Sequence, residues 1–191
     1  WCFMAESGLD SLTKTREVVV EWKAFELRPG GKFPGTPEQE ARYRQMVRER
    51  HGQMTAYARE HFGLEMGELP LGVNSRPALE GERYAREHGK GAEYHHACFV
   101  AHWQEERRLD DMDALTDIAQ SLGLNGDEFR EAVTSRKYRA EVEMDLTLAR
   151  EIGIDGVPAF VFGNRYLVSG ARPAGFLEQV VDKCVEEGLV E

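Results

Sequence analysis

The strand-like segments of this chain lie near its two ends, and the residues between them are predicted to be helical. Residues 17–25 are rich in β-branched and aromatic side chains, and Val18, Val20 and Trp22 fall on one face of such a strand. Residues 159–168 are typical of two short strands joined by a Gly-Asn turn. Because strands this short need partners, we expect the segments from both ends to pair in one sheet.

The long middle of the chain shows helix signals only. Thr36 followed by Pro37 and Glu38 is a typical helix start, and apolar residues recur at helical spacing up to His61. Further helices are predicted from a Ser75 cap to residue 88, and over about 92–107, 111–120, 127–134, 136–152 and 173–187. The prediction is therefore an α/β core formed by residues 1–35 and 153–191, with residues 36–152 as an all-helical insertion.

Composition excludes several classes of protein. The net charge of −10 argues against a general nucleic-acid binder, which carries a basic surface. No apolar run approaches the roughly 20 residues that a membrane-spanning helix needs. Three cysteines are too few for a disulfide scaffold of 191 residues. We therefore expect a globular domain without nucleic-acid or membrane partners.

The segment Gly153-Ile-Asp-Gly-Val-Pro-Ala-Phe160 is the most specific local signal. Pro158 stands directly before an apolar strand and has no N–H to donate to a ladder, so it belongs at a strand start or in a tight, cis peptide. Many strands begin in this way, and a proline that only ends a loop explains the local pattern equally well.

Cys2 is the second signal, because it stands in the first turn of a predicted helix. The positive end of the helix dipole favours a thiolate there. A free cysteine is more often a small buried apolar residue, so the position by itself leaves both interpretations open.

Taken together, these segments resemble the DsbA-like branch of the thioredoxin superfamily, specifically the FrnE-like proteins grouped near the 2-hydroxychromene-2-carboxylate isomerases. Those proteins carry Cys-Pro-Trp-Cys-Phe/Tyr, then Trp-x-x-Phe-x-Leu, then Gly-x-x-Gly-Val-Pro-x-Phe before the last hairpin. The matching residues are Trp1-Cys2-Phe3, residues 22–27, residues 153–160 and Ser169-Gly170-Ala171. The likeness covers essentially the whole chain and implies a thioredoxin-like fold.

The resemblance also implies a site and a reaction. Cys2 would be the second, resolving cysteine of a Cys-x-x-Cys pair in a thiol–disulfide oxidoreductase, with Trp1, Phe3, Val157 and Pro158 contacting a protein or small-molecule thiol or disulfide substrate. The nucleophilic cysteine would stand three residues before Cys2, so we expect the full-length protein to extend beyond Trp1 and to include a first strand there. No metal or nucleotide cofactor is expected, and relatives of this type indicate a cytoplasmic location.

Three alternatives remain open at this stage. A glutathione-dependent isomerase or transferase would have a serine in place of the nucleophile, with glutathione supplying the thiol. His95, Cys98 and His102 share one predicted helix face and are metal-ligand types, although one straight helix rarely surrounds an ion with three ligands. A partner-binding scaffold is the third. Cys98 and Cys184 each fall on an apolar helix face and are predicted to be core residues.

Overall fold

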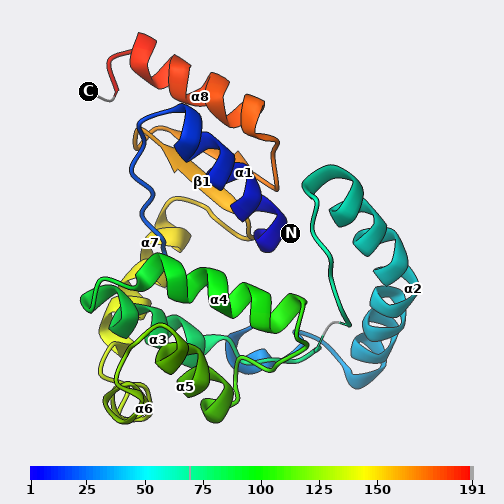
Figure 1. The fold of residues 1–191 in the computed structure, drawn as a ribbon. Helices are drawn as coiled ribbons and strands as arrows, with labels where there is room; N and C mark the ends of the chain where they lie inside the picture. The colour runs from blue at the N-terminus through cyan, green and yellow to red at the C-terminus, as the bar shows by residue number, and fades with distance from the viewer. Residues whose placement is uncertain (69, 190–191) are drawn as a thin grey trace. The chain divides into compact units, whose positions relative to one another are not determined.

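A computed structural model describes residues 1–68 and 70–189 of the chain (Figure 1). The chain divides into two compact units, which are described separately. The first comprises Trp1–Trp22 and Ala149–Glu191, and the second is Lys23–Leu148. In the described residues no helix is long and apolar enough to cross a membrane.

The first unit contains the sheet. Strand β1 (Ala159–Phe162) pairs antiparallel with β2 (Tyr166–Ser169), and Val161 lies opposite Leu167. Gly163 and Asn164 both have positive φ, of 54° and 53°, which is the conformation of a type I′ turn. The predicted hairpin is confirmed.

Two helices cover the inner face of this hairpin, as Figure 1 shows for the labelled α1 (Cys2–Thr15) and α8 (Ala174–Glu186). Leu9 and Leu12 of α1 meet Leu177 and Val181 of α8 in a buried cluster. Partly buried side chains packed against that cluster are Val18, Val20, Trp22, Phe160, Phe162 and Val168. This first core therefore combines residues from both ends of the chain.

Residues 17–25 do not form the strand that the pattern predicts. The alternation itself is present, because Val18, Val20 and Trp22 turn toward the core whereas Val19 is 99% exposed. However, in the described residues β1 and β2 pair only with each other, and residues 17–25 are extended without a ladder. Alternation fixes which side chains are buried, but a strand also needs a neighbouring backbone with matching hydrogen bonds. The predicted pairing of the two ends in one sheet is thus wrong for the part that the structure describes.

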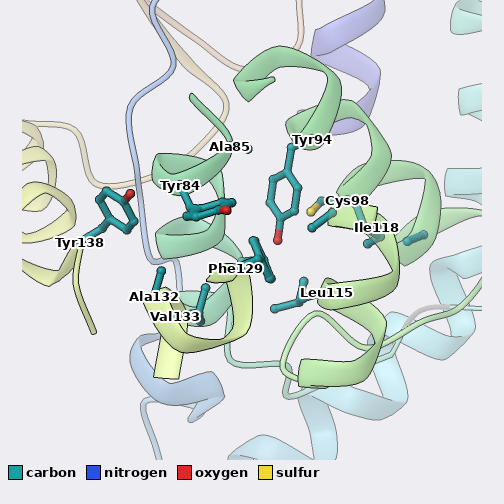
Figure 2. Close-up of a cluster of buried hydrophobic side chains, with 13 residues drawn as sticks. Tyr84, Ala85, Tyr94, Cys98, Leu115, Ile118, Phe129, Ala132, Val133 and Tyr138 are labelled. Carbon is teal, nitrogen blue, oxygen red and sulfur yellow. The ribbon is translucent and has the colours of Figure 1, made fainter. Parts of the chain in front are cut away.

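The second unit consists of helices around its own core. They are α2 (Pro37–Phe62), α3 (Arg76–Glu87), α4 (Gly91–Trp103), α5 (Met112–Ser121), α6 (Gly126–Thr134) and most of α7 (Arg139–Glu151), with a short 3₁₀ turn at Pro29–Gly31. Figure 2 shows the Tyr94 ring of α4 extending into this core toward Phe129 of α6, with Leu115 of α5 below. Tyr94, Phe129 and Tyr138 are all buried in this core.

Helix α2 begins as its sequence predicts. The Thr36 side chain accepts a hydrogen bond from the Gln39 N–H, the Gln39 side chain accepts one from Thr36, and Pro37 occupies the first turn. Gly63 ends the helix with φ of 65°. The Ser75 cap of α3 is a different case, because Ser75 already has helical backbone angles and Asn74 Oδ1 accepts the Arg76 N–H instead.

The boundary between the units differs from the sequence-based one. The sequence predicts that residues 23–35 belong to the α/β core, but in the structure they fall in the second unit. The contacts explain why: the Ala24 N–H donates to Asp145 Oδ2 at 2.7 Å, and Arg76 binds both carboxylate oxygens of Glu26. Both partners belong to helices of the second unit, so the chain joins that unit directly after Trp22.

A close approach within the first unit gives a test of its packing. A Cβ on Gly8 of α1 would stand 2.8 Å from the Arg172 carbonyl oxygen, which is backbone and has little freedom to move, whereas a Cβ on Gly175 of α8 meets nothing within 4 Å. We expect Gly8→Ala to lower the free energy of unfolding by about 1–3 kcal/mol. Gly175→Ala is the matched control and should leave it unchanged or raise it by up to about 1 kcal/mol, because alanine favours helix. Urea unfolding of both variants tests this, and equal stabilities would contradict the packing.

Candidate active site

Cys2 is the first residue of α1 and is partly buried as a free thiol. Trp1 precedes the helix, and its carbonyl accepts the Ala5 N–H at 2.9 Å. The three residues expected to act together therefore differ in exposure: the Trp1 residue is 53% exposed, Cys2 is intermediate, and Phe3 is only 2% exposed. Trp1 therefore lies at the surface, whereas Phe3 belongs to the interior.

The Cys2 thiol does not have the acidic character that its helix position suggests. Burial raises the pKa of Cys2 above its usual value. The loss of water around the thiolate is the largest cause, and it outweighs the causes that lower the pKa. The expectation of a favoured thiolate at Cys2 is therefore not met by the surroundings of this side chain.

Val157 and Pro158 form the segment that leads into β1. Their peptide bond is cis, and both residues are partly buried. The Pro158 carbonyl accepts the Gly170 N–H at 2.8 Å, which extends the hairpin by one backbone bond beyond the Ala159–Ser169 pair. Pro158 thus stands at a strand start, as the sequence predicts, and it belongs to the same unit as Cys2.

The other two cysteines are core residues, as predicted. Cys98 of α4 is buried, and burial raises the pKa of its thiol to about 12. Cys184 of α8 is 1% exposed and lies against the hairpin turn, 3.4 Å from where a Cβ on Gly163 would be. Both are free thiols. Neither has the exposure that thiol–disulfide chemistry requires.

The histidine and cysteine positions on α4 do not assemble a metal site. Within residues 1–68 and 70–189, no group of three or more His, Cys, Asp or Glu side chains is placed to hold an ion. Cys98 packs in the helical core, and His102 Nδ1 lies 3.3 Å from the Arg107 carbonyl oxygen. Burial lowers the pKa of His95 to about 4.

The whole-chain likeness to known proteins completes this description. Residues 1–182 match the DSBA-like thioredoxin domain. The chain belongs to this family. YwbO of Bacillus subtilis (strain 168) is 30% identical over 188 residues, which are 96% of this chain and 91% of YwbO.

Solved structures of other proteins have the same fold as this chain. A probable DsbA oxidoreductase from Streptomyces coelicolor superposes with a TM-score of 0.83 at 24% identity, over 98% of this chain and 86% of that one. A 2-hydroxychromene-2-carboxylate isomerase superposes with a TM-score of 0.76 at 19% identity, over 100% of this chain and 94% of that one. The expected fold class, a thioredoxin-like core with a helical insertion, is confirmed.

Sequence reasoning missed several buried charged side chains in this DSBA-like chain. Charged residues usually lie at the surface. Four of them are buried here, each with at most 9% of the whole residue exposed: Glu80, Glu82, Arg83 and Asp145. On α3 the charges alternate with small residues, Ala78, Gly81 and Ala85, and these pack in the apolar core rather than beside Asp145. Pairing α3 with α7 requires tertiary structure.

The three thiols of the reduced protein are predicted to differ in accessibility. A thiol-specific reagent should modify Cys2 first, and Cys98 and Cys184 should react only on unfolding, because both are buried. The rate at Cys2 should keep rising between about pH 7 and pH 9, since a raised pKa keeps the thiol protonated at neutral pH. Mass spectrometry of peptides after timed labelling measures this; faster labelling of Cys98 than of Cys2 would show the site assignment to be wrong.

Proposed function

We propose that this DSBA-like chain is a thiol–disulfide oxidoreductase in which Cys2 is the second cysteine of a Cys-x-x-Cys pair in the full-length protein. The observation that carries the proposal is the placement of a partly buried thiol at the first residue of α1, in the same unit as the Val157–Pro158 segment. Membership of the family supports it. The other two cysteines are buried elsewhere and do not compete for the role.

The reaction divides into two thiol–disulfide exchanges. The thiolate of the first cysteine attacks a substrate disulfide, which forms a mixed disulfide and releases one substrate thiolate that takes up a proton. Cys2 then loses its proton and attacks the first cysteine's sulfur, which releases the second substrate thiol and leaves the enzyme disulfide. The substrate gains two electrons and the enzyme loses two; the same steps in reverse oxidise a dithiol substrate.

The raised pKa of Cys2 suits a resolving thiol better than an attacking one. Burial keeps Cys2 protonated at neutral pH, so it does not compete for the incoming disulfide before the mixed disulfide has formed. In this proposal the acidic, attacking thiolate is that of the first cysteine.

The substrate is placed by Trp1, Val157 and Pro158. An extended thiol or disulfide substrate would add beside the Val157 backbone, and Pro158, which has no N–H, would limit that pairing to a short stretch. Trp1 offers an exposed aromatic surface next to Cys2. Phe3, which resemblance also suggested as a contact, would support the helix start from within because it is buried.

The proposal requires no bound metal or nucleotide cofactor, because both reaction steps use cysteine sulfur alone. We also propose a cytoplasmic location, with a protein or small-molecule thiol or disulfide as the substrate. In the alternative, an isomerase of the 2-hydroxychromene-2-carboxylate type, glutathione would supply the reactive thiol.

Substitution of Cys2 in the full-length protein tests the role directly. We expect Cys2→Ser to reduce insulin disulfide turnover, with dithiothreitol as the electron donor, by about tenfold or more, because the mixed disulfide is no longer resolved. When dithiothreitol is left out, a covalent adduct between the variant and its substrate should accumulate and be visible by mass spectrometry.

Cys184→Ser is the matched control, since it removes a thiol that is 1% exposed from the same unit. It should retain turnover per folded molecule. Full turnover in Cys2→Ser, or activity only as a glutathione-dependent isomerase in both variants, would overturn the oxidoreductase assignment.

A further inference from the structure

A single buried arginine in the second unit faces two carboxylates. Arg83 of α3 has a side chain only 3% exposed; its Nη2 pairs with Asp145 of α7, and its Nη1 lies 3.5 Å from Glu82 Oε2. Its Nε has no hydrogen-bond partner among the described residues. One cation therefore lies between two acids, with part of its hydrogen-bonding capacity unused.

Asp145 does more than pair with Arg83. Its Oδ2 also accepts the Ala24 N–H at 2.7 Å, and its Oδ1 lies 3.9 Å from Lys23 Nζ. Lys23 and Ala24 are the first residues of the second unit, so this carboxylate holds the chain where it passes into the helices. A backbone N–H that is buried without an acceptor costs free energy. Asp145 therefore fixes the position of the backbone at Ala24.

Glu82 stands close enough to disturb that arrangement. Its side chain is 11% exposed, and Arg86 of the same helix lies 3.6 Å from Oε2. The other charged groups that act on it are Asp145 and Glu141 of α7. From α4, Tyr94 and Cys98 face it, and the backbone at Gly91 is near enough that a Cβ there would lie 3.2 Å from Glu82 Oε1.

We propose that Glu82 and Asp145 compete for Arg83, so that loss of the Glu82 proton weakens the attachment of the chain at Ala24. With Glu82 neutral, Arg83 is committed to Asp145, and Asp145 is fixed as the acceptor for Ala24. With Glu82 ionised, a second anion draws on the same guanidinium and repels Asp145 across the α3–α7 contact. The segment at Lys23–Ala24 is then held less firmly.

The pH range follows from the surroundings of Glu82. Burial is the largest cause and raises the pKa of Glu82 to about 7; Arg86 opposes the shift, and Asp145 and Glu141 add to it. Since the pKa in the folded protein lies above that of an unfolded glutamate, the neutral form is favoured by folding, and its stabilising effect is lost as pH rises from about 4.5 to 7. Tyr94 and Cys98 stay protonated through this range, because burial raises the pKa of both.

Amide hydrogen exchange at Ala24 tests the proposal in the whole protein. After correction for the intrinsic pH dependence of exchange, we expect the protection factor of the Ala24 amide to fall roughly tenfold between pH 6 and pH 8, which corresponds to one pKa unit of coupling. In Glu82→Gln the factor should be the same at both pH values. The ¹³C titration of the Glu82 carboxyl group in the unmodified protein should have the same midpoint as the loss of protection.

Two further variants complete the experiment. Glu93→Gln removes an exposed carboxylate paired with Lys90 on α4 and should behave as the unmodified protein does. Asp145→Asn should give low Ala24 protection at both pH values. A protection factor that does not change with pH in the unmodified protein, or that falls equally in Glu82→Gln, would overturn the proposal, as would full protection in Asp145→Asn.

Discussion

The chain passes between its two compact units twice, so the two ends of the helical unit are constrained to lie together. Asp145 meets this constraint with one side chain: it accepts the backbone N–H of Ala24 from the first passage and lies three residues before Leu148 at the second. Arg83 provides the opposite charge from within the unit. The buried Asp145 carboxylate thus has both a hydrogen-bond donor and an opposite charge. A buried carboxylate needs such partners, because they offset the free energy lost when it leaves water.

A second set of ion pairs, around Arg76, connects the same segments of the helical unit. Arg76 at the start of α3 binds Glu26, two residues after Ala24, and reaches Glu143 of α7 at 2.9 Å. The residues just after the first passage are thus tied to α3, and α3 is tied to α7. In the first unit, by contrast, the two chain ends are joined mainly by apolar contact between α1, α8 and the hairpin. Ion pairs therefore connect the two ends of the helical unit, which also has an apolar core of its own, whereas apolar contact predominates between the chain ends in the first unit.

The candidate active site depends on the apolar arrangement. Cys2 begins α1, and α1 is placed by Leu9 and Leu12 against α8. The Val157–Pro158 segment is placed by the hairpin, which packs against the same cluster. Burial adds one property that the resemblance did not suggest, a Cys2 thiol that resists ionisation.

The amino-acid sequence determined most of the helices, the hairpin and the burial of Cys98 and Cys184, because these follow from local signals: Thr36 and Gln39 at a helix start, Gly163-Asn164 at a turn, and apolar residues at periods of two or 3.6. It also determined the family, through motifs spread over the whole chain. Tertiary structure alone decided that residues 17–25 stay without a ladder, that the helical unit begins at Lys23, and that Glu82 and Asp145 share Arg83. Each of these depends on which backbone group or charge from a distant part of the chain lies within a few ångströms. The local pattern of apolar and polar residues does not predict such contacts.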